Sequence, residues 1–294
     1  MNYKMKKFSL VTISLCLLLA LVVHLPVSNA QESVTKKMDN GIIFKSLAAD
    51  KLPEPKIKDE KLKKARVNTL MQEAHRIWAD ENNMSAVNDF LRANGCIILT
   101  PEKSKVIGNV SSLQDDVTMG LPGIAYETWS GYYIITGTMQ WKKIGTTTNP
   151  RWMNDFDGGA GDADVVLLSI GDGQNANFKN KGYSLSIKNK NGVSVHVPNA
   201  ESWDKSGVIW RPQDQFTSDV NGLNKNYNLD SYFATLSLEV IGGTAVNLPV
   251  FNQYGHTWKK TAISGFGFFS NGLTLSYADS SYGWKAISGP KYYN

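Results

Sequence analysis

The sequence has 294 residues, of which 42% are hydrophobic, 19% are charged and 11% are aromatic. This apolar content suffices for a sizeable core and excludes a wholly disordered or collagen-like chain. Two cysteines exclude a disulfide-dense scaffold and a Cys-based zinc module, and the formal charge of +5 is too small to indicate nucleic-acid binding.

The first thirty residues have the layout of a secretory signal peptide. A lysine-rich start precedes an uncharged apolar run, and the small residues 28–30 follow Pro26. We expect cleavage before Gln31 in preference to an uncleaved membrane anchor. The mature protein would then be secreted and extracellular, with no membrane span, and would contain one cysteine, Cys96, and no internal disulfide.

Residues 31–59 are rich in charges and contain two prolines, which is typical of a flexible arm. Residues 60–119 are expected to form a helical hairpin and a connector. Apolar residues recur there at three- and four-residue spacing, as in Val67, Leu70 and Ala74, and Asn94-Gly95 ends the second helix. We interpret His75 as a residue that packs its ring at the edge of this stripe, and Cys96 as a small buried hydrophobe.

From about residue 120 to residue 294 the pattern changes to alternation of apolar and polar residues. About nine short strands follow one another with no helical segment long enough for a parallel crossover. The fold class is therefore mainly β. We expect an antiparallel β-sandwich or jelly roll at the C-terminus, preceded by the small αα-hairpin.

Three Gly-containing turns predict how the strands pair. A two-residue turn at Ser130-Gly131 would place Ile124 and Tyr126 on one face with Tyr133. At Asn191-Gly192 the apolar register demands a loop with an odd number of residues, such as a type I turn with Gly192 as a left-handed bulge. At Asn271-Gly272 a two-residue turn would bring Leu275 opposite Phe268.

An acidic, glycine-rich segment follows the second of the expected strands. Four carboxylates at such density repel one another unless water or a cation separates them, and Ca²⁺ takes six to eight oxygen ligands. The candidate metal ligands are Asp155, Asp157, Asp162 and Asp164. Residues 158–166 resemble the glycine-aspartate nonapeptide of RTX calcium-binding β-rolls, although Ala163 stands where that repeat has Asp and there is a single copy. The alternative is a solvated acidic loop.

Aromatic residues beside Gly, Asn, Ser or charged residues are the other candidates for a site. Exposed rings can stack on the apolar faces of sugars, whereas most Trp side chains in proteins fill the core. The candidate ligand-binding residues are Trp129, Tyr132, Trp152, Trp203, Trp258 and Trp284.

These patterns indicate a secreted, non-catalytic protein that binds a glycan or cell-envelope polymer, with Ca²⁺ as a stabilising ion. The expected partner is a cell-wall or extracellular polysaccharide. One alternative is an extracellular glycan hydrolase, for which Glu127 and Glu239 would be the carboxylate pair. The other is a sandwich protein with a removable N-terminal pro-region.

Overall fold

The computed structural model describes residues 52–99, 117–142, 158–159, 161–170, 177–205, 207–218, 225–243, 248–257, 261–269, 272–278, 283–288 and 291–293. These residues belong to one unit that spans residues 43–294. The expected signal peptide and most of the expected arm lie outside the described residues.

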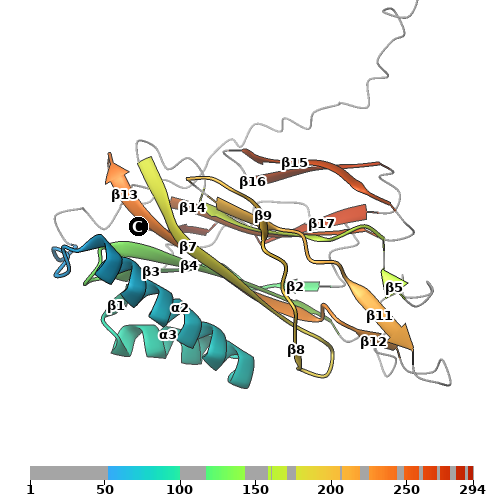
Figure 1. Cartoon of the computed structure of the whole chain (residues 1–294), viewed down its shortest axis with the longest axis horizontal. Coiled ribbons are helices and arrows are strands. Elements are labelled where there is room, and N and C mark those ends of the chain that lie inside the picture. The colour runs from blue at the N-terminus through green and yellow to red at the C-terminus, as the bar shows by residue number, and fades with distance from the viewer. Residues whose placement is uncertain are drawn as a thin grey trace, which may run out of the picture. The chain divides into compact units, whose positions relative to one another are not determined.

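The described chain is mainly β, with antiparallel sheets and two helices that precede most of the strands, as the sequence predicts (Figure 1). The helices are α2 (Glu60–Glu81) and α3 (Met84–Ala93). The larger sheet has seven strands in the order β1-β3-β4-β13-β7-β8, with β2 also paired to β4. Its strands are β1 (Cys96–Ile98), β2 (Val117–Met119), β3 (Gly123–Glu127), β4 (Tyr132–Trp141), β7 (Asn177–Lys188), β8 (Ser194–Val195) and β13 (Ser231–Gly242).

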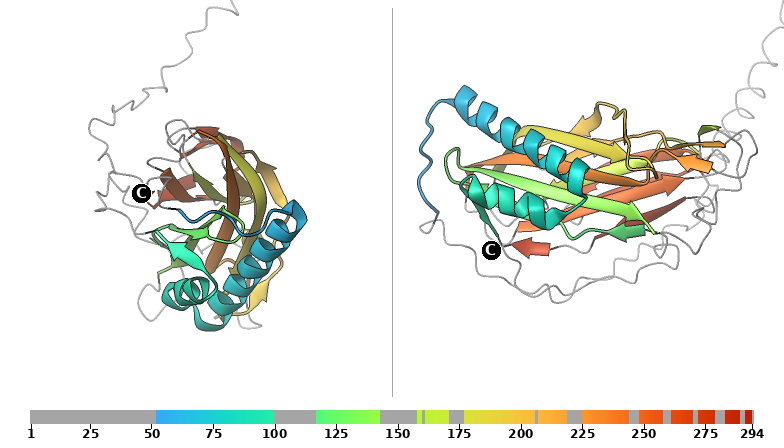
Figure 2. Two further views of the ribbon diagram at one scale, coloured as in Figure 1. Left: turned by 90° about the vertical axis from the view of Figure 1, so that its left-hand side faces the viewer. Right: turned by 90° about the horizontal axis from the view of Figure 1, so that it is seen from below.

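A second sheet of six strands has the order β17-β14-β6-β10-β9, with β18 paired to β14. Its strands are β6 (Val165–Ile170), β9 (Ala200–Trp203), β10 (Gly207–Trp210), β14 (Leu248–Thr257), β17 (Gly283–Ile287) and β18 (Lys291–Tyr293). Two smaller sheets complete the set: β5 (Gly158–Gly159), β11 (Gln215–Ser218) and β12 (Lys225–Tyr227), and the hairpin β15 (Ile263–Phe269) with β16 (Gly272–Tyr277). Figure 2 shows how the strands of the two larger sheets curl.

Alternation along the strands distributes side chains between three apolar layers. The largest lies between the two main sheets and includes Leu236 of β13 and Val250 of β14. On the outer face of the larger sheet, Phe233 joins residues of α2 and α3. On the outer face of the smaller sheet, Phe251 packs with residues of the β15–β16 hairpin. The sandwich is therefore covered on one side by helices and on the other by a hairpin.

The helical hairpin forms as its sequence predicts. Asp59 caps α2 by accepting a hydrogen bond from Leu62 N at 2.9 Å, and α2 ends at Asn82, which is left-handed with φ 49°. The predicted stripe is buried against the sheet. His75 packs edge-on against Phe233 at 4.6 Å between ring centroids, so its interpretation as a packing residue is confirmed. Cys96 is also buried, as expected.

The turn between β3 and β4 is wider than predicted. Tyr126 pairs with Tyr133 and Glu127 with Tyr132, so residues 128–131 form a four-residue loop instead of a two-residue turn at Ser130-Gly131. The reason is the Glu127 carboxylate, which accepts hydrogen bonds from Trp129 N at 3.2 Å and Ser130 N at 2.7 Å. The shift by two residues preserves the predicted faces, because side chains alternate with period two.

Of the other two turns, one forms as predicted and one differs in its residue pairing. At Asn191-Gly192 the odd loop is confirmed, since Ile187 pairs with Val195 and Gly192 is left-handed with φ 77°. At Asn271-Gly272 the prediction was wrong by two positions, because Leu275 pairs with Phe266 instead of Phe268. Here Gly272 is already the first residue of β16, and the apolar face is again preserved.

The end of the expected arm contacts the β3–β4 loop. Ile57 N donates to Trp129 O at 2.8 Å, and the Tyr126 hydroxyl donates to Pro53 O at 3.3 Å. Leu52 packs against the core between the sheets. Residues 52–59 are thus held against the larger sheet, while residues 31–51 of the arm lie outside the described part.

Candidate ligand-binding site

Two of the six predicted ligand-binding aromatics present exposed rings. Trp203 is 57% exposed and Trp129 is 40% exposed. Tyr132 is fully buried, and its hydroxyl donates to Glu60 Oε2 at 2.7 Å. Trp152, Trp258 and the side chain of Trp284 lie outside the described residues.

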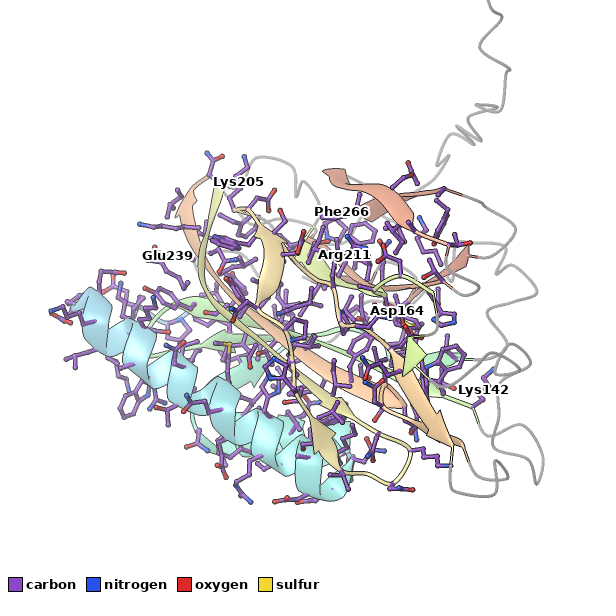
Figure 3. All side chains as sticks on the ribbon, turned by 45° about the vertical axis from the view of Figure 1, so that its right-hand side comes forward. Lys142, Asp164, Lys205, Arg211, Glu239 and Phe266 are labelled. Carbon is purple, nitrogen blue, oxygen red and sulfur yellow. The ribbon has the colours of Figure 1, made fainter. Side chains whose placement is uncertain are left out.

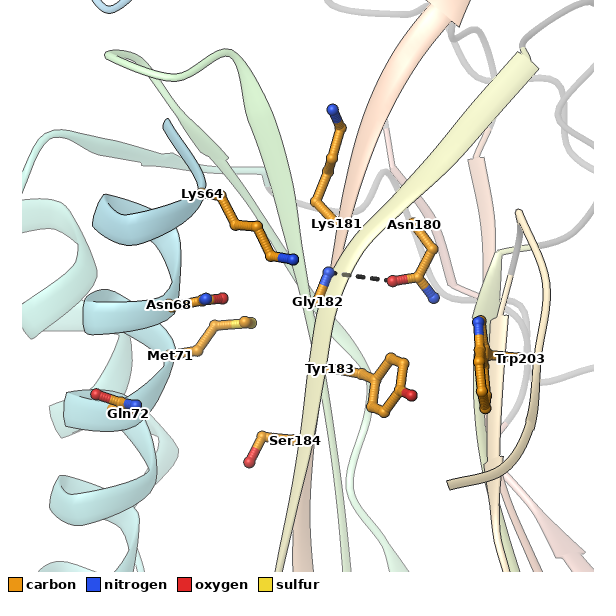
Figure 4. Close-up of a pocket in the computed structure, with 10 residues that line it drawn as sticks. All are labelled: Lys64, Asn68, Met71, Gln72, Asn180, Lys181, Gly182, Tyr183, Ser184 and Trp203. Atoms are coloured by element: carbon orange, nitrogen blue, oxygen red, sulfur yellow. Dashed lines mark hydrogen bonds between the residues drawn. The ribbon is translucent and has the colours of Figure 1, made fainter. Parts of the chain in front are cut away.

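Trp203 borders a pocket of about 510 Å³ that we call the bulge pocket (Figure 4). Its lining residues come from α2, from the middle of β7 and from β9. They are Lys64, Asn68, Met71, Gln72, Asn180, Lys181, Gly182, Tyr183, Ser184 and Trp203. Trp129 is not among them, so the two exposed indoles do not form one platform.

A β-bulge in β7 shapes this pocket. Ser237 of β13 pairs with Gly182 and Leu238 pairs with Asn180, which leaves Lys181 as an extra residue in β7. The bulge reverses the alternation of β7, so that Phe178 and Leu185 both reach the core between the sheets. The pocket is lined by the bulge and by the two residues that follow it, residues 180–184.

The pocket lies along an open edge of the larger sheet. On its outer side β7 pairs with β8 at Ile187 and Lys188, and no strand in the described part of the chain pairs with that side nearer its start. Backbone N–H and C=O groups of an unpaired edge need partners, and a polar ligand can supply them. Glycine at position 182 lets two side chains of α2 approach the strand closely. A Cβ there would lie 3.0 Å from Asn68 Oδ1 and 3.3 Å from Met71 Cε.

The aromatic wall is built where β9 passes β7. The rings of Trp203 and Tyr183 lie 5.9 Å apart at an interplanar angle of 40°. Tyr183 in turn meets the buried Trp210 edge-on at 6.0 Å. Tyr183 is therefore fixed from behind, and it supports an indole that is largely open to solvent.

The opposite wall is polar. Asn68 and Gln72 project from α2 and Ser184 lies on the same side of β7, whereas Asn180 lies on the side of β7 that faces Trp203 (Figure 4). Asn180 is oriented by the bulge, because its Oδ1 accepts from Gly182 N at 3.1 Å. Amide and hydroxyl groups can both donate and accept hydrogen bonds, which is what sugar hydroxyls require.

Ion pairs fix the start of α2 to the bulge. Lys181 Nζ lies 2.9 Å from Glu60 Oε2 and 2.7 Å from Glu239 Oε2. Hydrogen bonds from Lys181, Lys63 and Tyr132 lower the pKa of Glu60 to about 2. Lys181 is thus a structural cation that joins the helix to β7 and β13.

The carboxylates considered for hydrolysis are both engaged elsewhere. Glu127 is fully buried, and Arg66 Nε donates to its Oε1 at 2.9 Å. Glu239 pairs with Lys181. Neither side chain lines the bulge pocket.

Two of the four predicted metal ligands, Asp162 and Asp164, lie in the described part of the chain. Asp155 and Asp157 lie outside the described residues. Asp162 Oδ2 lies 2.5 Å from Arg211 Nη2, whereas the side chain of Asp164 is fully buried; Figure 3 labels Arg211 and Asp164. Asp162 and Asp164 therefore bind different partners.

Asp164 belongs to a buried cluster that the sequence did not reveal. His256 Nδ1 lies 2.9 Å from Asp164 Oδ1 and 3.5 Å from Asp214 Oδ2. The hydroxyls of Tyr254 and Tyr227 donate to Asp164 and Asp214 respectively. Burial raises the pKa of both carboxyl groups well above the usual range.

Among the described residues, Asp164, Asp214 and His256 are the group whose ligand atoms could hold a metal ion, all lying within 4.8 Å of one another. A nitrogen ligand suits Zn²⁺ or another transition ion better than Ca²⁺. The three residues are far apart in the sequence and have no metal-binding spacing, so a sequence pattern gives no signal for them.

In the described part of the chain, neither helix has the length and apolar content needed to cross a membrane. No family model matches the sequence, and no curated protein does. Among solved structures, the protein is similar to one titled "AvmM Catalyzes Macrocyclization in Alchivemycin A Biosynthesis", with a TM-score of 0.22 and 16% identity over 54% of this chain and 82% of that chain. A likeness at that TM-score does not establish a common fold, so function is argued from the residues of this chain.

Proposed function

We propose that the protein is a secreted, non-catalytic binding protein for a glycan or cell-envelope polymer, and that the bulge pocket is its binding site. The observation that carries this proposal is Trp203, which is 57% exposed at the rim of a pocket of about 510 Å³. An exposed indole costs free energy unless a ligand covers it, and a flat ring matches the apolar face of a sugar.

The rest of the pocket supplies what a saccharide needs beyond stacking. Asn68, Gln72 and Asn180 offer amide groups at different heights along α2 and β7. The open edge of β7 adds backbone donors and acceptors. The pocket thus combines one apolar platform with several hydrogen-bonding groups, which is the arrangement of small-molecule sites that fix orientation by few polar groups.

Affinity electrophoresis through gels that contain cell-wall polysaccharides tests the proposal. Trp203→Ala should abolish retardation, with a loss of affinity of at least about tenfold, because a Trp at the centre of a site often contributes most of its binding energy. Trp129→Ala is the matched control, since Trp129 is exposed but lies outside the pocket. If Trp129→Ala loses binding and Trp203→Ala retains it, the pocket is not the site. Release of reducing sugar ends would contradict the non-catalytic part of the proposal.

Secretion rests on the sequence of residues 1–30. Mass spectrometry of protein recovered from culture medium should show one species that begins at Gln31. A species that begins after residue 119 would favour the alternative in which residues 31–119 are a removable pro-region.

A stabilising ion is the remaining part of the proposal. Ca²⁺ at the acidic segment is supported by the carboxylate density around Asp162 and Asp164. We expect EDTA to lower the melting temperature and added Ca²⁺ to restore it. Recovery with Zn²⁺ but not Ca²⁺ would move the ion to the cluster around His256. An unchanged melting temperature would show that the fold holds no structural ion.

A further inference from the structure

The bulge pocket continues into a second pocket of about 300 Å³ with which it shares Lys64, Asn180 and Lys181. The second pocket is also lined by Lys61 and Lys179. We propose that the ligand is an acidic glycan whose carboxylate or phosphate groups are bound by Lys61, Lys64 and Lys179, which we call the lysine strip. This inference rests on the proposed glycan-binding function and names its substrate class.

The local charge balance supports an anionic ligand. Glu60 is the one carboxylate that lines either pocket, and its negative charge is taken up by Lys63 and Lys181. Lys181 is neutralised further by Glu239. Glu60 and Glu239 are therefore both already paired.

No carboxylate in the described part of the chain pairs with the lysine strip. The other ion pairs of α2 and α3 use other residues: Arg66 pairs with the buried Glu127, and the exposed faces of the helices hold pairs such as Glu73 with Arg76 and Asp89 with Arg92. Like charges held near one another repel, and binding an anion removes that repulsion. Lysine ammonium groups on flexible stems also suit a ligand whose charges are spaced along a polymer.

The residues of the lysine strip come from two elements, α2 and β7. Lys61 and Lys64 are three residues apart on α2 and so share a face of the helix. Lys179 lies on β7 opposite Glu239, two residues before the bulge. Figure 4 shows Lys64 and Lys181 on one side of the pocket and Trp203 on the other. A chain of sugars could stack one ring on Trp203 while a neighbouring acidic group reaches the lysines.

Isothermal titration calorimetry with matched probes tests the inference. The probes are oligogalacturonate, the same oligosaccharide with its carboxylates methyl-esterified, and poly(glycerol phosphate). We expect one acidic probe to bind and the esterified probe to bind more weakly. The dissociation constant of the acidic probe should rise by on the order of tenfold between 50 and 500 mM NaCl, because ions screen the charges. The uronate and phosphate arms distinguish the two sources of negative charge.

Lysine-to-glutamine variants test whether the lysine strip binds the acidic probe. Lys64→Gln and Lys179→Gln should each weaken binding of the acidic probe by up to about fivefold, and the triple variant with Lys61→Gln by on the order of a hundredfold. Lys142→Gln is the control, because it changes the net charge equally at an exposed site far from the pocket (Figure 3). Circular dichroism and melting temperature confirm that each variant folds.

Two results would overturn the inference in different ways. If the acidic and esterified probes bind equally and the lysine variants match Lys142→Gln, the ligand is neutral and the proposed glycan binding stands. If none of the probes binds and Trp203→Ala changes nothing on any polysaccharide, both the inference and the proposed function fail.

Discussion

Acid should destabilise this fold through His75, because the ring of that residue is buried between α2 and the larger sheet. Its Nδ1 lies 2.7 Å from Ser186 Oγ and its Nε2 lies 3.0 Å from Thr235 Oγ1. These hydroxyls satisfy a neutral imidazole, and no carboxylate among them offsets a positive charge. Burial therefore lowers the pKa of His75 from 6.5 to about 4.

The sign and size of the effect follow from proton linkage. In the unfolded chain His75 takes up a proton below pH 6.5, whereas in the folded chain it does so below about pH 4. The free energy of unfolding should then be unaffected above pH 6.5 and fall by roughly 3 kcal/mol as the pH drops to 4. Lower pH should cause no further loss from this residue.

Urea unfolding of the protein and of His75→Gln at several pH values isolates this contribution. Glutamine does not titrate, so the difference in free energy between the two proteins should shrink by about 3 kcal/mol between pH 7 and pH 4. Other acid-sensitive groups cancel in that difference as long as they are independent of His75. Parallel pH profiles for the two proteins would refute the reasoning.

The remaining predictions concern the β3–β4 loop and the cysteine. Glu127→Ala should lower the free energy of unfolding by about 3–5 kcal/mol, because it leaves Arg66 and two loop amides without their acceptor; a loss below 1 kcal/mol in urea would show that the pair is not structural. Gly131→Val should cost about 2 kcal/mol, since Gly131 has φ 79° and a Cβ there would lie 2.6 Å from Pro55 Cγ; an unchanged melting temperature would argue against this loop conformation. Burial raises the pKa of Cys96 to about 12, so iodoacetamide should alkylate it at pH 8 in urea but not in native protein, and rapid native labelling would contradict its burial.

Periodicity predicted the fold class well, because the residues of an apolar stripe or of an alternating set all lie on one face of their element. The stripe on α2 and the alternation in β13 each face a single apolar layer, so local pattern and tertiary packing agree. The face of the sheet on which each side chain lies was predicted correctly even at Ser130-Gly131 and Asn271-Gly272, where the pairing of residues was wrong by two positions. The turn dipeptides predicted which face each side chain occupies but not which residues pair across the strands. A side chain such as Glu127 can stabilise a longer loop and so shift the pairing.

Features that break alternation were missed. The bulge at Lys181 lets β7 pair with β13 from Asn177 to Lys188 although its alternation reverses, and residues 180–182 line the pocket. The end of β14 breaks alternation in another way. Asn252 and His256 are polar, yet both are fully buried: Asn252 Nδ2 donates to Thr138 O of β4, and His256 Nδ1 lies 2.9 Å from Asp164 Oδ1. Long-range partners of this kind leave no local signal in the sequence.

One candidate aromatic lines the pocket that we propose as the site. Trp203 was singled out for the polar residues around it, and it does line a pocket. Tyr132 stood beside the same kind of turn residues but is buried under Lys181 and Glu60. Composition near an aromatic residue therefore does not separate an exposed ring from a covered one, because coverage depends on α2, which lies about seventy residues earlier in the chain.

The most direct test of the glycan-binding account is ¹⁹F NMR of protein labelled with 5-fluorotryptophan. The chain contains eight Trp residues, and the Trp203→Phe and Trp129→Phe variants assign the two exposed ones. On addition of a bound oligosaccharide, the account predicts that the Trp203 resonance shifts in proportion to saturation while that of Trp129 stays in place. A Trp203 resonance that does not move at saturating ligand would contradict the assignment of the bulge pocket as the binding site.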